Sequence, residues 1–159
     1  MKLNLYYFQS QKEAWSEQAL ELYKAKLQRF GPFEAIGLKA KSMERSRADK
    51  KLLAEEQILL KHIEPGDELV LFDVRGQKKN SEDFSNFLQK RFESGKAKLN
   101  FVIGGAYGFS ETLRERANHR ISFSDLTMNH HVALVVALEQ LYRAPVSYTH
   151  LTLPTILLV

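Results

Sequence analysis

A short apolar run in the middle of the chain constrains its fold more than any other feature. Residues 68–73 read ELVLFD, so four apolar side chains follow one another instead of alternating with polar ones. A strand of this kind is typical of a parallel sheet that is buried on both faces. Parallel strands also need long crossover connections, usually helices. The run therefore predicts an α/β domain, provided that helical segments separate the strands.

Helical and strand patterns do alternate along the chain. Apolar residues recur at helical spacing, and we expect them to face the core. In the first helix they include Trp15, Leu22 and Phe30, and in the second Leu53. Ser81 is the expected N-cap of the third helix. The pattern predicts a single domain with a largely parallel sheet flanked by helices on both faces. Strands are expected at 2–8, 33–38, 68–73, 99–103 and 120–124, and helices at 11–30, 46–63, 81–95, 110–118 and 130–143.

Composition excludes several classes of protein. The chain has no cysteine, which excludes disulfide frameworks, thiolate metal sites and cysteine catalysis and fits a reducing cytoplasm. No apolar run reaches the roughly 18 residues of a membrane span. The formal net charge of +4 is compatible with a polyanionic partner, although many ordinary enzymes share it. We therefore expect a cytoplasmic protein that does not contact membranes.

The chain changes character after Ala144. Residues 145–159 contain no Asp, Glu, Lys or Arg, in a chain of which 26% is charged. Pro145 lacks the N–H that a continuing helix requires, so the last helix is expected to end before it. A further strand is one interpretation, but the segment 145–155 resembles an in-frame translation of a transposon adapter from sequencing libraries. We take residues 1–144 as the domain and interpret 145–159 as a non-native tail.

Two segments follow strands and could hold a ligand, because open α/β sheets bind ligands at the carboxyl ends of their strands. Residues 104–108 read GGAYG, and glycines there allow a close approach of the backbone to a ligand. This segment is neither a dinucleotide fingerprint nor a P-loop, and a tight turn without a ligand is an equal alternative. Residues 123–128 could supply backbone donors and an apolar slot for an adenine. On chemistry alone, a loop whose polar side chains cap backbone groups is favoured.

The histidines give no support for metal chemistry. His130 and His131 are adjacent, so they cannot both face one metal ion from a helix, and no histidine pair has the i, i+4 spacing. His62 and His119 are isolated. The sequence also has no Gly-x-Ser-x-Gly elbow, and no residue before Ala144 is an obvious general base. We expect neither a metal site nor hydrolase chemistry.

Taken together, the segments resemble one family. Residues 101–110 read FVIGGAYGFS, residues 121–130 read ISFSDLTMNH, and residues 139–144 read EQLYRA. These motifs are similar to those of the RlmH family, the ribosomal large-subunit pseudouridine N3-methyltransferases of the SPOUT superfamily. The resemblance covers residues 1–144, and its most specific block is 101–128.

The resemblance implies a SPOUT-type domain with a C-terminal trefoil knot in which S-adenosyl-L-methionine binds. The implied reaction methylates N3 of a pseudouridine in the helix 69 region of 23S rRNA on the assembled ribosome. Another SPOUT-class RNA methyltransferase with a different target base, or a non-catalytic nucleotide-binding module on the ribosome, are the alternatives. By position, the family's cofactor residues correspond to Phe72, Gly104, Phe123, Ser124, Asp125, Leu126, Thr127 and Met128.

The resemblance further implies a homodimer in which the partner completes each site. We expect the helix at 130–143 in its interface, because this helix is more apolar than one buried face requires. The apolar residues in question are Val132, Val135, Val136, Leu138 and Leu141.

The chain departs from the family pattern near its end. Leu134 stands where the family usually has arginine, and Asn129-His130 stands where it has Pro-His. The tail also replaces a Pro-Tyr-His ending that contributes to the RNA site, and Tyr148-Thr149-His150 resembles that ending only superficially. By resemblance Arg143 contacts the nucleotide or its phosphate. A structural ion pair with Glu139, one turn back, is the alternative role of Arg143.

Overall fold

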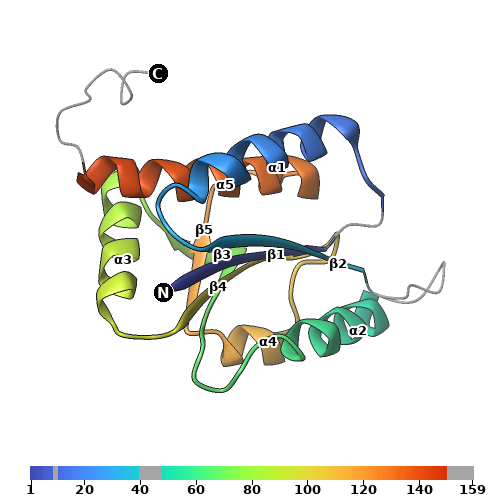
Figure 1. The fold of residues 1–159 in the computed structure, drawn as a ribbon. Coiled ribbons are helices and arrows are strands. Elements are labelled where there is room, and N and C mark those ends of the chain that lie inside the picture. Colours follow the sequence, from blue (N-terminus) through green and yellow to red (C-terminus); the bar gives the residue numbers. More distant parts are fainter. Residues whose placement is uncertain (9–10, 40–47, 150–159) are drawn as a thin grey trace.

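The computed structural model describes residues 1–8, 11–39 and 48–149, with side chains up to Pro145, as a three-layer α/β domain (Figure 1). Its strands are β1 (Lys2–Phe8), β2 (Phe33–Leu38), β3 (Glu68–Lys78), β4 (Lys98–Ile103) and β5 (His119–Ser122). They form one sheet in the order β2-β1-β4-β3-β5, and all neighbouring strands are parallel. The prediction of an α/β domain with a parallel sheet is confirmed.

Helices cover both faces of the sheet. They are α1 (Ala14–Leu27), α2 (Ala48–Leu60), α3 (Ser81–Glu93), α4 (Glu111–Arg116) and α5 (His130–Thr149). One face is covered by α1, α3 and α5, with α5 packed against both of the others, and the opposite face by α2 and α4 (Figure 1). Within the described ranges, no helix is both long and apolar enough to cross a bilayer.

The apolar run in β3 fills the cores on both faces of the sheet at once. Val70 and Phe72 belong to the core beneath α1, α3 and α5, whereas Leu69 and Leu71 belong to the core beneath α2 and α4. Successive side chains of a strand point to opposite faces, so a strand that is covered on both sides needs apolar residues at every position. This is the physical reason for the unbroken run.

Beyond this run, β3 continues to Lys78 and pairs with β5 twice. Phe72 is opposite Ile121, and after a register shift Gln77 is opposite the same residue, so residues 73–76 bulge out of the ladder. At the end of the bulge, a Cβ on Gly76 would lie 2.6 Å from the backbone nitrogen of Ile121. Only glycine fits so close to a neighbouring backbone. The sequence prediction ended this strand at residue 73, because the charged residues and the glycine that follow do not resemble a buried strand.

Several residues expected in the core are exposed. In α1, Trp15 and Leu22 expose 49% and 56% of their surface, while Ser16 and Leu20 are buried on the face that meets the domain. Ser16 can be buried because its hydroxyl donates to the carbonyl of Glu13 at 3.0 Å. Exposed as well are Phe30 after α1 and Leu53 in α2. Apolar residues lie around much of these helices, so spacing alone did not select the buried face.

The last helix continues through Pro145 to Thr149, which corrects the expectation that it ends near Arg143. A proline inside a helix removes one backbone hydrogen bond. Here Pro145 is buried, and the Ser85 hydroxyl donates to the carbonyl of Ala144 at 2.9 Å, so contacts with α3 hold this turn in place. Tertiary packing overrides the local preference. Residues 150–159 of the expected tail lie outside the described residues.

The N-cap of α3 also differs from the expectation. The side-chain oxygen of Asn80 accepts a hydrogen bond from the backbone N–H of Asp83 at 2.8 Å, and Ser81 is the first helical residue instead of the cap. Both side chains favour the capping position, so the sequence alone did not distinguish them. The expected cap of α4, Ser110, is confirmed, because its hydroxyl oxygen accepts from the N–H of Leu113 at 3.1 Å.

Two alanine substitutions test the cap of α3. We expect Asn80→Ala to lower the free energy of unfolding by about 1 kcal/mol, because one N–H in the first turn loses its acceptor. Ser81→Ala is the matched control, with an expected change below about 0.5 kcal/mol. Urea denaturation followed by circular dichroism measures both. A larger loss in Ser81→Ala than in Asn80→Ala would contradict the assignment.

Candidate functional site

A cavity of about 400 Å³ lies at the carboxyl ends of β4 and β5 and at the end of the buried run of β3, where its bulge begins. Residues from these three places contribute to it, and the start of α5 closes one side. Open α/β sheets present their ligand sites at this edge. The walls consist of residues 72–74, 103–106, 108–109, 123–124, 126–130 and 133.

The cavity brings together all but one of the cofactor residues that the resemblance suggested. Phe72, Gly104 and five residues of the 123–128 segment line it, although they come from three strand ends that are far apart in the sequence. Asp125 does not line the cavity. Its carboxylate is exposed and forms an ion pair with Lys78.

Stacked aromatic rings form the inner wall. The ring of Phe72 stacks on Phe123 with centroids 4.3 Å apart and on Phe101 with centroids 5.1 Å apart. Such contacts hold the side chains in fixed positions at the floor of the cavity. The wall is therefore rigid and apolar, which suits a flat apolar ring of a ligand.

The glycine segment after β4 forms the opposite wall as a tight turn. Gly105 and Gly108 form an isolated bridge, and Gly108 has φ +73°, a conformation that favours glycine. A Cβ on Gly104 would lie 2.8 Å from the carbonyl oxygen of Gly108, so the turn has no room for a side chain there. These glycines leave the backbone itself as the lining of the cavity.

Glu55 supports this turn from behind, a role that the sequence did not suggest. It is a buried residue of α2, and a Cβ on Gly105 would lie 2.7 Å from one of its carboxylate oxygens. Burial raises the pKa of Glu55, while Lys51 and a bond from the backbone of Gly105 act in the opposite direction. The neighbouring Glu56 accepts a hydrogen bond from the hydroxyl of Ser110 at 2.9 Å. Two buried glutamates of α2 therefore pack against the glycine turn and the start of α4, next to the cavity.

Two serines, Ser122 at the end of β5 and Ser124 within the segment, stabilise the conformation of residues 123–128. The Ser122 hydroxyl donates to the carbonyl of Ser124 at 3.0 Å, and the Ser124 hydroxyl accepts from the N–H of Leu126 at 3.0 Å. The capping role weighed for this loop is therefore present, and the same loop also lines the cavity.

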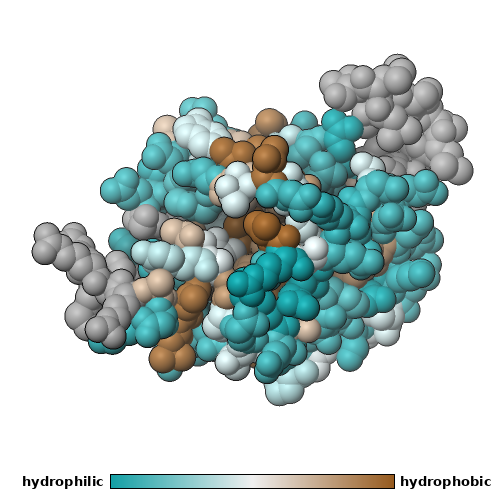
Figure 2. Space-filling view, turned by 180° about the vertical axis from the view of Figure 1, so that it is seen from behind, coloured by the Kyte–Doolittle hydropathy of each residue, from teal (hydrophilic) through white to brown (hydrophobic). Residues whose placement is uncertain are grey.

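Three apolar side chains, Val74, Leu126 and Met128, are exposed at the rim of the cavity. Figure 2, which views the molecule from behind, shows hydrophobic residues gathered in a narrow central band between hydrophilic ones.

A buried ion pair joins the cavity to α4. Asp73 lines the cavity and accepts from Arg114 Nε at 2.6 Å, and the two side chains expose only 5% and 10% of their surface. The hydrogen bond to Asp73 raises the pKa of Arg114 despite the opposing effect of its burial. Asp73 also accepts from the backbone N–H of Arg75 at 3.2 Å, which fixes the start of the bulge in β3. A buried carboxylate with these partners is satisfied and stays in place.

His130 is the histidine that the structure places in the cavity. Its Nε2 atom is buried and has no hydrogen-bond partner among the described residues. Burial, followed by the neighbouring His131 and Lys51, lowers the pKa of His130, so the imidazole is neutral at neutral pH. A neutral imidazole can accept a hydrogen bond or a proton from a ligand. From the sequence, His130 was weighed as a metal ligand and as part of a departure from the family pattern, and it was not assigned to this site.

Arg143 lies outside the residues that line the cavity. It forms an ion pair with Glu139, one turn earlier in α5, so the structural role weighed for this arginine is present. Glu139 also accepts from the hydroxyl of Tyr23 in α1, and this bond raises the pKa of Tyr23 to about 12. Burial alone would raise the pKa of Glu139, but the bonds from Tyr23 and Arg143 lower it. These residues join α1 to α5.

The arrangement can bind a small molecule between an aromatic wall and a glycine turn, with polar groups at one end. In the part of the chain that the structure describes, no group of three or more His, Cys, Asp or Glu side chains is placed to hold a metal ion. The residues that line the cavity can position a ligand and exclude water, and His130 can accept a hydrogen bond or a proton from it.

Comparison with known proteins agrees with this geometry. A family model described as "Predicted SPOUT methyltransferase" matches residues 1–147. The chain is 42% identical over 144 residues to "Ribosomal RNA large subunit methyltransferase H" of Bdellovibrio bacteriovorus, covering 91% of this chain and 92% of the relative. The protein of the same name from Cytophaga hutchinsonii is 33% identical over 144 residues, 91% of this chain and 93% of the relative. That from Caldicellulosiruptor saccharolyticus is 37% identical over 133 residues, with coverages of 83% and 86%.

The family match, over residues 1–147, includes all of the region 1–144 in which the sequence motifs lie. It includes the strand ends, the glycine turn and the 123–128 segment that meet at the cavity. The chain therefore belongs to the SPOUT methyltransferase family.

Proposed function

We propose that this protein is an S-adenosyl-L-methionine-dependent methyltransferase of the large-subunit ribosomal RNA. Its proposed target is N3 of a pseudouridine in the helix 69 region of 23S rRNA, on the assembled ribosome in the cytoplasm. The names of the relatives support an rRNA methyltransferase. The observation that carries the proposal is the convergence of three distant strand ends on one cavity.

The residues of the cavity fit this cofactor. The stacked rings of Phe72 and Phe123 offer an apolar surface for an adenine, and Thr127 and Asn129 offer polar groups for a ribose. The turn at Gly104, which lines the cavity, can close only because no side chain is present there: a Cβ would lie 2.8 Å from the carbonyl oxygen of Gly108. An aromatic wall with a few convergent polar groups is the usual composition of a cofactor site.

When bound, the cofactor supplies a sulfonium methyl group that is already strongly electrophilic. The remaining task of the chain is to align the target nitrogen and to keep water away. The exposed apolar side chains of Leu126 and Met128 lie at the rim, where a bound RNA base would cover them. We also propose that the chain forms the trefoil knot of its family around this cavity, which tracing the chain in a crystal structure would test.

Gly104→Val tests the site of the cofactor. A side chain at this position would meet the carbonyl of Gly108 and distort the turn that lines the cavity, so we expect the affinity for S-adenosyl-L-methionine to fall by at least about tenfold. Isothermal titration calorimetry measures it. Gly66→Val is the control, because a Cβ on Gly66 has no neighbour within 4 Å. An unchanged affinity in a folded Gly104→Val protein would place the cofactor elsewhere.

We further propose a homodimer that forms through α1 and α5. Leu138 and Leu141 of α5 are fully buried within the subunit, so they are not available to a partner. Val132 is 43% exposed, and Trp15 of α1, also exposed, packs edge-on against the neighbouring His131. Exposed apolar side chains on adjoining helices are typical of an interface.

Light scattering tests the dimer. We expect a dimer at micromolar concentration, and Val132→Glu should shift it to a monomer by placing a charge in the interface. Leu53→Glu is the matched control, because Leu53 is also exposed, at 52%, but lies on α2, on the opposite face of the sheet. A parent chain that is monomeric in this measurement would contradict the proposal.

We propose, finally, that residues 145–159 are not native and that the chain as it stands is a poor catalyst. All residues that line the cavity precede Ala144, so cofactor binding should persist. The Pro-Tyr-His ending that its family resemblance implies for RNA contact is absent from the sequence. Loss of contacts that act mainly in the transition state lowers turnover more than cofactor affinity.

Three chains test whether residues 145–159 impair turnover. They are the sequence as it stands, one truncated after Ala144, and one with a family-like Pro-Tyr-His ending. Tritium transfer from labelled cofactor to ribosomes measures turnover, and calorimetry measures cofactor affinity. We expect only the third chain to methylate well, with a gain on the order of a hundredfold from restored positioning. Equal turnover by the first and third chains would mean that the tail is functional.

A further inference from the structure

The cofactor cavity is the first of three hollows that lie side by side near β5. It shares Phe123 and Met128 with a second hollow of about 320 Å³ between α3, β5 and α5. That hollow in turn shares Lys79 and Ile121 with a groove of about 510 Å³ along β5, which we call the basic groove. The basic groove is lined by residues 75–77, 79, 87, 114–115 and 117–121.

The basic groove contains two cations that the protein does not neutralise. Lys79 and Arg120 have no carboxylate partner in the described part of the chain. Lys79 lies over the ring of Phe87 at 5.4 Å, a contact that orients its side chain without cancelling its charge. Glu115 is the one carboxylate among the described lining residues.

The other two arginines of the basic groove have a different role. Arg114 is bound to Asp73 and Glu111, and Arg75 is bound to Glu111 at 2.7 Å. Their charges are largely balanced. They build the wall between the groove and the cofactor cavity, because Asp73 lines the cavity and Arg114 lines the groove.

The middle hollow differs from the groove in its chemistry. Phe84, Phe123 and Val136 give it apolar walls, while Asn80 and Gln140 bring side-chain amides to it. Apolar walls can enclose a flat base, and amides can both donate to and accept from its edge. Its position between cations and the cofactor cavity matches the order of groups in a nucleotide whose base is the target.

We propose that the basic groove binds backbone phosphates of the RNA substrate through Lys79 and Arg120, next to a middle hollow that receives the target base. This inference rests on the proposed function and adds the direction in which the RNA crosses the protein. Phosphate contacts supply most of the affinity for a nucleic acid and set its register. The planar guanidinium of Arg120 suits bidentate binding of a phosphate.

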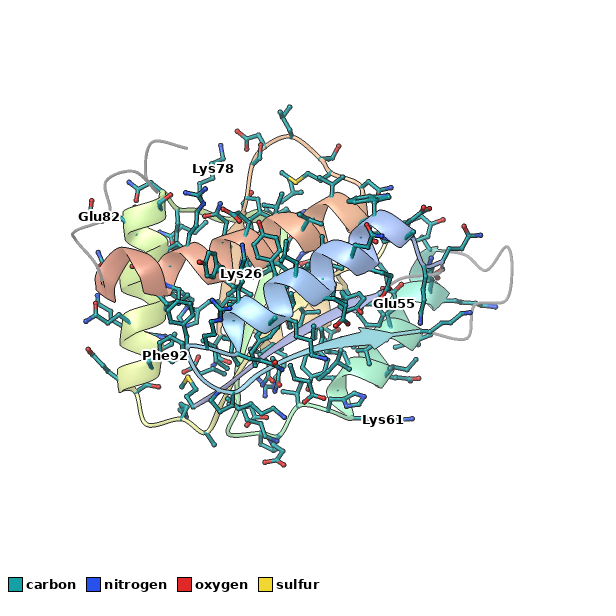
Figure 3. The ribbon with its side chains drawn as sticks, turned by 45° about the horizontal axis from the view of Figure 1, so that its top comes forward. Lys26, Glu55, Lys61, Lys78, Glu82 and Phe92 are labelled. Atoms are coloured by element: carbon teal, nitrogen blue, oxygen red, sulfur yellow. The ribbon has the colours of Figure 1, made fainter. Side chains whose placement is uncertain are left out.

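Charge removal tests the basic groove. We expect the double variant Lys79→Gln, Arg120→Gln to bind large ribosomal subunits more weakly. The slope of log binding constant against log salt concentration should be shallower by about one to two. Filter binding over a series of salt concentrations measures the slope with the full chain. The control is Lys61→Gln, an exposed lysine that lies far from Lys78, the neighbour of Lys79 (Figure 3). It should leave the slope unchanged.

Two further measurements separate this inference from the proposed function. Cofactor affinity by calorimetry should stay the same in the double variant, and light scattering should show an unchanged oligomeric state. If the parent chain binds the cofactor and ribosomal subunits but the double variant keeps the parental slope, the basic groove is wrong and the proposed function stands. A changed oligomeric state would make the groove a subunit contact and overturn the inference. A chain with the family-like Pro-Tyr-His ending that binds the cofactor but no ribosomal RNA would overturn both.

Discussion

The close approach of β3 and β5 at Gly76 is the constraint on which the rest of the site depends. The two strands pair on both sides of the bulge at 73–76, and the backbone of Ile121 leaves no room for a side chain at Gly76. Because the ladder resumes after the bulge, the residues within it are fixed at both ends. Asp73 and Val74 thereby line the cavity, while Arg75 and Gly76 line the basic groove. One local irregularity of a strand thus contributes to two neighbouring hollows, the proposed sites of the cofactor and of the RNA phosphates.

The buried pair of Asp73 and Arg114 stabilises this division. A buried carboxylate without a partner would be strongly destabilising, so the arginine of α4 is required wherever the bulge turns Asp73 inward. The pair also ties α4 to β3, although the chain reaches α4 only after β4. Behind the glycine turn, Glu55 of α2 has a comparable effect on Gly105. Acidic residues therefore hold two walls of the cavity in place: Asp73 through its pair with Arg114, and Glu55 through its contact with Gly105.

The sequence predicted the sheet well because β3 carries an unbroken apolar run and the other strands are short, mostly apolar segments that alternate with helical patterns. The site segments were found because glycines and short polar residues after strands have a clear physical meaning. Asp125 was grouped with its neighbours, but the chain turns it outward to Lys78, and nothing in the local sequence encodes that direction. Asp73, Glu55 and His130 were missed as parts of the site because their roles depend on contacts between distant segments. Such contacts follow from the topology, which periodicity does not specify.

Helix α5 explains how the end of the chain can influence a site that is complete before it. His130, at the start of the helix, lines the cavity, and Val136 and Gln140 line the middle hollow. Because the Ser85 hydroxyl donates to the carbonyl of Ala144 at 2.9 Å, a residue of α3 supports the turn at Pro145. All residues that line the cavity precede Ala144, so under the proposed function the tail acts on substrate contact and not on the lining of the cavity.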